Sequence, residues 1–209
     1  MFTRDYKDSG PGQFFHIYNR GNNKQNIFIE DQDFEFFSMR LKQNLYPERF
    51  KGLNIQTLPS GSFSLASHCL MPNHFHFLIR QNTEVSTSKL MLRVCSSYSK
   101  FFNKKYERVG HVFQDQFKQV PIYNDKQLRW LVSYICQNPK IAGIVNNLAD
   151  YKWSSYPEYL SKKNDGLTHK ELFKEIFKGE DDINFIETSY QIIKDNKIGQ
   201  RIEEELLMD

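Results

Sequence analysis

The order of predicted strands and helices indicates an α+β protein with a ferredoxin-like sandwich, an antiparallel sheet with helices packed on one face. Three observations support this class. Short aromatic and apolar runs predict strands at residues 14–18 and 63–80, segments with helical spacing alternate with them, and a tight connection at 72–73 makes two strands antiparallel neighbours. A length of 209 residues is enough for one substantial domain or a domain with an appendage.

The N-terminal part predicts a strand followed by a helix. Residues 14–18 are aromatic and β-prone, and residues 19–23 after them are typical of a turn. Asp31 or Asp33 can cap a helix, and Pro47 ends it. The apolar residues of this helix follow helical spacing: Phe34, Phe37, Leu41 and Leu45.

A pair of strands comes next. Residues 63–70 predict one strand, and the tight connection at 72–73 leads into a second strand that carries His74 and His76. A further short strand is expected at 54–58.

The second half predicts a helix, a strand and another helix. Thr87 can cap a helix with one apolar stripe, formed by Leu90, Val94, Tyr98 and Phe101. Residues 112–121 predict a strand. A cap at Asn124 or Asp125 begins the last helix, which we expect to stop at Pro139.

Charge divides the chain into a basic body and an acidic end. Residues 1–169 carry 22 Lys and Arg against 14 Asp and Glu, whereas residues 170–209 carry 6 against 11. We therefore predict a domain over 1–160 and an acidic, helical C-terminal extension over 161–209, with a polar linker at 162–166. A net charge of about +8 on the body favours a polyanionic partner, although an ordinary solvated surface would also explain it.

The cysteines and the hydropathy of the sequence indicate in which cellular compartment the protein is expected. Cys69, Cys95 and Cys136 are odd in number, widely spaced and set in apolar segments, which favours free buried thiols over disulfides or a zinc knuckle. No apolar run is long enough to span a bilayer, and the N-terminus lacks a signal-peptide pattern. We expect a soluble, cytoplasmic protein that does not bind membranes.

Two histidines mark the strand after residue 72. Side chains alternate across a strand, so His74 and His76 point the same way while Phe75, Phe77 and Ile79 point into a core. Convergent imidazoles can hold a divalent cation, and imidazole ligands alone would favour zinc. The alternative is a pair of unrelated, half-buried histidines.

The last predicted helix carries a second pair of polar residues. Tyr134 and Asn138 are four residues apart and therefore share one helical face. Taken alone, Tyr134 fits the core or its rim. Taken with the histidines, it fits a nucleophile beside a metal ion that is bound by two imidazoles and an amide oxygen.

The chain resembles the single-tyrosine HUH transposases (IS200-like transposases), and among these the REP-associated tyrosine transposases. The resemblance covers residues 12–160. Five motifs carry it in the order found in the family: residues 16–21 (HIYNRG), 71–76 (MPNHFH), 110–114 (GHVFQ), 134–139 (YICQNP) and 153–156 (WSSY).

This resemblance implies an HUH endonuclease architecture and a specific chemistry. By analogy, His74, His76 and Asn138 bind Mg²⁺ or Mn²⁺, with Gln137 as the second choice for the third ligand. Tyr134 attacks DNA to form a 5′-phosphotyrosine. The implied function is DNA transposition and recombination by a metal-dependent endonuclease that cleaves and rejoins single-stranded DNA beside a hairpin.

Departures from the family concern expected DNA contacts. Gln116 stands where the family commonly has Arg, and Lys140 with Ile141 stands where it has Val followed by a basic residue. The resemblance and the basic second helix together predict a DNA-binding set: Arg20, Arg93, Lys100, Lys104, Lys105, Arg108 and His111. His16 fits either a role at the site or a structural one.

Several alternatives stay open at this point. A protein with the same fold could bind a hairpin or a specific sequence without cutting it, and a metal hydrolase could use the histidines to activate water. Relatives act as monomers in cis or as homodimers in trans. The resemblance implies a prokaryotic protein that associates with the nucleoid when it acts.

Overall fold

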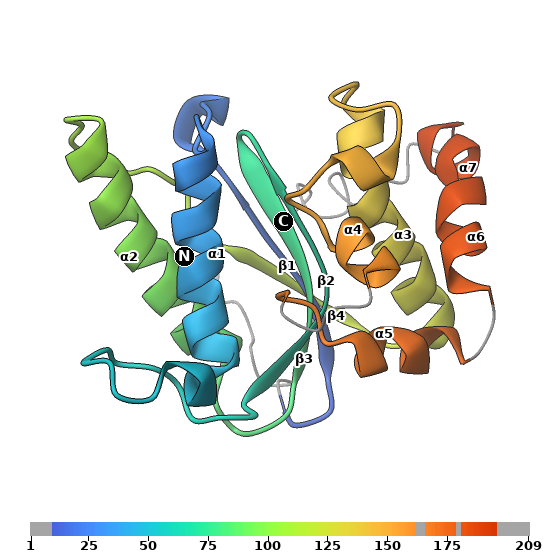
Figure 1. Ribbon diagram of the computed structural model, residues 1–209, viewed down its shortest axis with the longest axis horizontal. Coiled ribbons are helices and arrows are strands. Elements are labelled where there is room, and N and C mark those ends of the chain that lie inside the picture. The colour runs from blue at the N-terminus through green and yellow to red at the C-terminus, as the bar shows by residue number, and fades with distance from the viewer. Residues whose placement is uncertain (1–9, 162–165, 179–180, 196–209) are drawn as a thin grey trace, which may run out of the picture.

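A four-stranded antiparallel sheet forms the centre of the protein (Figure 1). The computed structural model describes residues 10–161, 166–178 and 181–195. The strand order is β2-β3-β1-β4. The strands are β1 (Phe14–Arg20), β2 (Phe63–Met71), β3 (His74–Gln81) and β4 (Lys118–Ile122).

Helices cover both faces of this sheet (Figure 1). On one face lie α1 (Asp31–Leu45) and α2 (Thr87–Lys105). On the other lies α3 (Asp125–Ile141). Shorter helices pack around α3 and the β2 edge: α4 (Ser155–Leu160), α5 (Lys170–Phe177), α6 (Asp182–Thr188) and α7 (Tyr190–Asp195).

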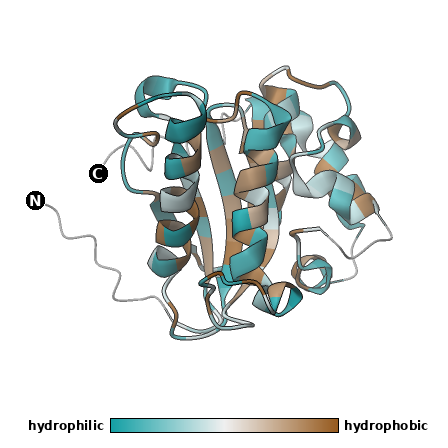
Figure 2. Cartoon of the chain, turned by 60° about the vertical axis from the view of Figure 1, so that its left-hand side comes forward, coloured by the Kyte–Doolittle hydropathy of each residue, from teal (hydrophilic) through white to brown (hydrophobic). Residues whose placement is uncertain are grey.

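The predicted α+β class with an antiparallel sheet is confirmed, but the expectation that helices occupy one face only is wrong. Strand β3 is apolar on both sides, since Phe75 and Phe77 belong to one core cluster and Leu78 belongs to the other. A sheet with two apolar faces needs a helical layer on each. Figure 2 shows the same division, with hydrophobic residues on the strands and on the helix sides next to them.

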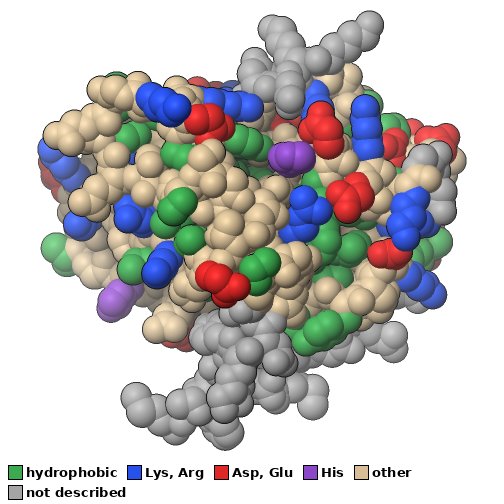
Figure 3. All heavy atoms as spheres, turned by 90° about the horizontal axis from the view of Figure 1, so that it is seen from below, with side chains coloured by type: hydrophobic (Ala, Val, Ile, Leu, Met, Phe, Trp, Pro, Cys, Tyr) green, Lys and Arg blue, Asp and Glu red, His purple; other side chains and the backbone are tan. Residues whose placement is uncertain are grey.

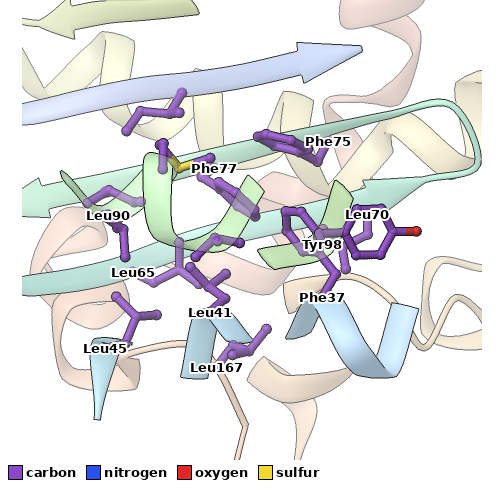
Figure 4. Packing of buried hydrophobic residues seen from close by; sticks show 14 of the residues in the cluster. Phe37, Leu41, Leu45, Leu65, Leu70, Phe75, Phe77, Leu90, Tyr98 and Leu167 are labelled. Carbon is purple, nitrogen blue, oxygen red and sulfur yellow. The ribbon is translucent and has the colours of Figure 1, made fainter. Parts of the chain in front are cut away.

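The first core lies between the sheet and α1 with α2 (Figure 4). Phe37, Leu41 and Leu45 follow one another at four-residue spacing along α1, which places them on one stripe. They meet residues from the other elements of this layer: Leu65, Leu70, Phe75, Phe77, Leu90, Tyr98 and Leu167. The apolar stripe of α2 ends on Phe102, which is buried, rather than on the predicted Phe101.

The N-terminus of α1 is held by a capping box. Glu30 is the N-cap, and Asp33 accepts a hydrogen bond from its backbone N–H. Lys105 and Tyr106, at the end of α2, also donate to the Asp33 carboxylate, at 2.6 and 2.7 Å. These hydrogen bonds hold the pKa of Asp33 below its ordinary value although burial opposes them. The cap is thus Glu30 rather than Asp31 or Asp33, and Asp33 joins the two helices.

Three other local expectations are corrected. Residues 54–58 form no strand. The strand expected at 112–121 begins only at Lys118, because residues 112–114 make isolated backbone hydrogen bonds to the segment that follows β1. Helix α3 continues through Pro139 to Ile141. Proline lacks an N–H, but at this position in the last turn only one helical hydrogen bond is lost, and the Ala142 N–H donates to the Asn138 carbonyl as in a regular helix.

The edge strand β2 is closed by chain that follows α3. The Leu70 N–H donates to the Trp153 carbonyl, and the His169 N–H donates to the Leu65 carbonyl. Covering an edge in this way blocks pairing with other chains. The described part of the C-terminal segment adds Leu172, Phe173 and Ile186 to the second core.

The division at residue 160 stays a prediction. Four of the five residues in the predicted linker (162–165) and the last residues of the acidic extension lie outside the described residues. No helix in the described part of the chain has both the length and the apolar character needed to cross a membrane.

Candidate active site

His74 and His76 lie on the sheet face that is covered by α3. Their rings are 5.0 Å apart between centroids and nearly perpendicular. His76 pairs with Tyr18 of β1 and Cys69 of β2, and His74 opens the strand directly after the β2–β3 turn. Phe75 and Phe77 point into the opposite core. The predicted common face of the two histidines is therefore confirmed.

Helix α3 places Tyr134 and Asn138 over these histidines. The Tyr134 ring meets the His76 ring edge to face, with centroids 5.5 Å apart. The side chain of Asn138 lies beside His74, whose pKa it raises against the effect of burial, and donates its Nδ2 to the Tyr134 carbonyl at 2.9 Å. These four residues thus form one cluster, although the nearest two across the strand and the helix, His76 and Tyr134, are 58 positions apart in the sequence. Only 4% of Tyr134 is exposed.

A third imidazole lies in the same cluster. Nε2 of His16, on β1, is 3.0 Å from Nδ1 of His76. The His16 ring also stacks on Tyr18, with centroids 5.0 Å apart. The sequence leaves His16 open between a site role and a structural one. One signal in the sequence could have placed His16 near the histidine pair. His16 and Tyr18 are two residues apart on a strand whose other face is apolar, so both side chains lie on the face opposite that core.

A hydrogen bond to the neighbouring Asn73 sets the orientation of the His74 ring. Its Nδ1 lies 2.6 Å from Oδ1 of Asn73, in the turn between β2 and β3. Asn73 in turn donates its Nδ2 to the Lys24 carbonyl, which supports this direction of its amide. An amide oxygen only accepts, so Nδ1 of His74 carries the proton and Nε2 presents a lone pair. From the sequence, Asn73 was interpreted only as a turn residue.

Burial makes the imidazoles of this cluster neutral. It lowers the pKa of His74 to about 4 and that of His16 to about 3. Burial also holds the pKa of His76 well below its ordinary value, and the neighbouring His74 and His16 lower it further. A neutral imidazole is the form that binds a metal ion.

Stability is expected to fall as the pH drops from about 6.5 towards 4. In the unfolded chain His16 and His74 titrate near 6.5, whereas burial lowers the pKa of His74 to about 4 in the folded protein. Below about 6.5 the unfolded state therefore takes up protons that the folded state does not, which favours unfolding by about 1.4 kcal/mol per unit of pKa difference. Urea denaturation at roughly pH 5 and pH 7.5 should show the lower midpoint at pH 5; equal midpoints would contradict this.

The cluster has a donor set that fits a divalent cation. Nε2 of His76 is buried and has no hydrogen-bond partner, which is uncommon for a buried polar atom. Within the described residues, no three His, Cys, Asp or Glu side chains gather in a metal-binding arrangement, so a third ligand from these types is absent there. The Asn138 side chain, already against His74, is the amide in reach.

Gln137 does not join the cluster. Its side chain is buried against α6, where Nε2 donates to the Ile186 carbonyl at 2.6 Å. Adjacent residues on a helix point about 100° apart, so Gln137 and Asn138 face different neighbours. The structure places Gln137 in the packing of α3 against α6.

The predicted DNA-binding residues lie on different elements and do not form one cluster in the described part of the chain. Arg20 ends β1 beside His74 and contacts Gln114, with Nη2 3.3 Å from Oε1. Arg108 is bonded to Gln25 in the loop after β1, at 3.2 Å. Lys100, Lys104 and His111 are exposed.

Two of the predicted cations are already engaged elsewhere. Lys105 is paired with Glu30 and Asp33, each at 2.6 Å, at the junction of α1 and α2. Arg93 donates to the Gln56 carbonyl in the loop that precedes β2. Both contacts are intramolecular, and both lie on the α1–α2 side of the sheet rather than on the side of the histidines.

At the end of the molecule opposite the β2–β3 turn, the described residues carry charges of both signs. Figure 3 views that end, and in the part drawn in colour Lys and Arg side chains are interspersed with Asp and Glu. The turn that precedes His74 lies at the other end of the sheet, at the top of Figure 1.

Gly21 closes the loop beside Arg20. A Cβ on this residue would overlap the Gln25 carbonyl oxygen and would lie 2.8 Å from Cγ2 of Ile27. Gly21→Ala is therefore expected to destabilise the protein by about 1–3 kcal/mol, measured by urea denaturation. Gly10→Ala is the matched control, because a Cβ there meets nothing within 4 Å. Equal midpoints for the two variants would contradict the expected clash.

Comparisons with known proteins found one family and a similar solved structure. Residues 38–138 match the model of the family described as "Transposase IS200 like". A solved structure described as "Structure of the REP associates tyrosine transposase bound to a REP hairpin" matches with a TM-score of 0.55 and 18% identity, over 78% of this chain and 86% of that chain. No curated protein matches the chain.

The fold is similar to that of this tyrosine transposase. The part that matches the IS200-like transposase family, residues 38–138, includes both histidines, Tyr134 and Asn138. The resemblance drawn from the sequence is confirmed.

Proposed function

We propose that this protein is a metal-dependent endonuclease of the HUH type, which cleaves and rejoins single-stranded DNA beside a hairpin as part of DNA transposition. The observation that carries the proposal is the meeting of Tyr134 and Asn138 with His74 and His76 in one cluster. A phenol, two neutral imidazoles and an amide together match the needs of phosphoryl transfer to a tyrosine.

His74, His76 and Asn138 are the proposed ligands of Mg²⁺ or Mn²⁺. His74 and His76 would bind through Nε2, because Nδ1 of His74 faces Asn73 and Nδ1 of His76 faces His16. When bound, the ion would polarise the scissile phosphate and offset the charge that grows on it during attack. The preference for these ions over zinc rests on the family, since two imidazoles alone suit zinc.

Tyr134 is the proposed nucleophile. Its oxygen attacks the phosphorus and loses its proton as a bond from the phenolic oxygen to phosphorus forms. The bond from phosphorus to the 3′ oxygen breaks, and that oxygen takes up a proton. The products are a 5′-phosphotyrosine and a free 3′-hydroxyl. Rejoining reverses these steps, so the energy of the broken linkage stays in the protein–DNA bond and no nucleotide cofactor is needed.

The low exposure of Tyr134 has a consequence for this reaction. A phosphate must come within bonding distance of the phenolic oxygen, yet 4% of the residue is exposed. We infer that DNA binding is accompanied by a local movement that opens the space over His76.

DNA contacts are proposed for those residues of the predicted set that lie at the end of the sheet near the β2–β3 turn or are exposed. Arg20 beside His74 is the first of these, followed by Lys100, Lys104, Arg108 and His111. A hairpin as the substrate is supported by the similar solved structure, which is a transposase bound to a REP hairpin. Lys105 and Arg93 are proposed to hold the α1–α2 layer instead.

The reaction is proposed to run in cis. Tyr134 contacts His76 within a single chain, so a second copy is not needed to supply the nucleophile. We propose a monomer that acts in the prokaryotic cytoplasm, associated with the nucleoid while it cleaves, with residues 1–160 as the catalytic domain and 161–209 as its acidic extension.

A cleavage assay tests the proposal. The full chain is incubated with Mn²⁺ and labelled single-stranded oligonucleotides that carry a hairpin and flanking bases of varied sequence. We expect a covalent protein–DNA species on a denaturing gel, together with a shorter labelled product, and the loss of both in EDTA. Binding of the hairpin with no cleavage under any of these conditions would instead favour a protein that binds nucleic acid without cutting it.

A further inference from the structure

The hydrogen bond between His16 and His76 decides which nitrogen of His76 faces a ligand. Nε2 of His16 lies 3.0 Å from Nδ1 of His76, and both rings are buried. Each neutral imidazole has one N–H and one lone pair, so one of the two nitrogens donates and the other accepts. The two arrangements leave opposite groups on Nε2 of His76, either a lone pair or an N–H.

The surroundings of Nε2 favour one arrangement. This atom is buried and has no hydrogen-bond partner. If it carried the proton, a buried N–H would lack an acceptor, which is rarer and more unfavourable than an unused lone pair. The preferred state therefore has the proton on Nδ1 of His76, which donates to Nε2 of His16.

We propose that His16 is a positioning residue, which accepts a hydrogen bond from Nδ1 of His76 and thereby keeps the Nε2 lone pair of His76 directed at a divalent cation. This inference rests on the metal site of the proposed function. Metal-bound histidines commonly donate their second ring nitrogen to such a partner, which fixes both the tautomer and the ring orientation.

His74 has a similar hydrogen bond at its Nδ1. Oδ1 of Asn73 lies 2.6 Å from Nδ1 of His74 and can only accept, so it fixes the matching tautomer there. Both histidines thus have their Nδ1 held by a side chain from an adjacent turn or strand. His16 is itself fixed in place by stacking on Tyr18 and His76, with centroids 5.0 and 5.2 Å away.

The tautomer of His76 can be read directly in the metal-free protein. Long-range ¹H–¹⁵N spectra of the full chain should show Nδ1 of His76 protonated and Nε2 unprotonated. His16→Phe keeps a stacked ring but has no acceptor, so we expect a mixed or reversed tautomer of His76. His16→Gln offers an amide oxygen as an acceptor and should restore the wild-type pattern. A protonated Nε2 in the wild-type protein, or an unchanged tautomer in His16→Phe, would overturn the proposal.

Binding of Mn²⁺ without DNA is the second measurement. Followed by the electron spin resonance of free Mn²⁺, the Kd of His16→Phe should rise about 10- to 100-fold, and that of His16→Gln should stay closer to the wild-type value. His169→Asn is the control, because His169 caps α5 outside the cluster and Asn can keep that cap. An unchanged Kd in His16→Phe would overturn the role of His16.

These measurements separate this inference from the proposed function. If the wild-type protein takes up no Mn²⁺, the metal site itself is wrong, and the tautomer spectra still decide whether His16 accepts from His76. If the wild-type protein binds Mn²⁺ and His16→Phe matches it in both tautomer and Kd, only the role of His16 fails. Circular dichroism and urea midpoints identify any variant whose fold has changed. If His16→Phe is such a variant, the tautomer and the Kd of His16→Gln test the role of His16 instead.

Discussion

Replacement of Tyr134 with Phe is expected to remove all covalent protein–DNA adduct while leaving the fold and the binding of DNA and Mn²⁺ intact. The adduct needs the phenolic oxygen, and Phe keeps the ring that packs edge to face on His76. A denaturing gel of the reaction with a labelled hairpin oligonucleotide measures the effect, and gel shift measures binding. Residual adduct should lie below the detection limit.

The control for this substitution is Tyr123→Phe, since Tyr123 is exposed and directly follows β4, outside the cluster. It should form adduct at the wild-type level. Undiminished adduct in Tyr134→Phe would place the nucleophile elsewhere, and Tyr18, which stacks on His76 with centroids 5.8 Å apart, would be the first residue to test. Tyr98 is excluded from that role, because it is buried in the opposite core and donates to the Ile27 carbonyl.

Replacement of His74 or His76 with Ala is expected to remove Mn²⁺ binding and to lower cleavage by about 100-fold or more, as loss of a preorganised electrostatic contact in an active site does. Each variant removes one imidazole ligand and leaves Tyr134 in place. Mn²⁺ titration and single-turnover cleavage measure the two effects separately. His169→Asn again serves as the control, and cleavage by the wild-type protein that persists undiminished in EDTA would defeat the assignment.

Substitutions at two adjacent residues, Asn138 and Gln137, test which of them is the third ligand. Asn138→Ala should weaken Mn²⁺ binding, because the Asn138 side chain lies against His74. Gln137→Ala should lower the urea midpoint, because Gln137 bonds to the Ile186 carbonyl, but should leave the Kd for Mn²⁺ near the wild-type value. The reverse pattern would exchange the two roles.

Much of the fold follows from local pattern. Alternation along residues 74–79 was enough to place the two histidines on one face and Phe75 with Phe77 on the other. The starts of α1 and α2 and the end of α1 were predicted to within a few residues. The extra helical layer was missed because its cause, an apolar second face shared by several strands, becomes visible only when the strands are paired.

The sequence by itself determined the class of fold, the common face of His74 and His76, and the shared helical face of Tyr134 and Asn138, because these depend on the repeat of one strand or one helix. The meeting of this strand with helix α3 was implied only by the family resemblance, and the tertiary structure alone decided that Gln137 turns towards α6 and that His16 and Asn73 contact the histidines. Such contacts join residues up to 64 positions apart, as His74 and Asn138 are, and their geometry depends on how whole elements pack. Side-chain periodicity carries no information about that packing.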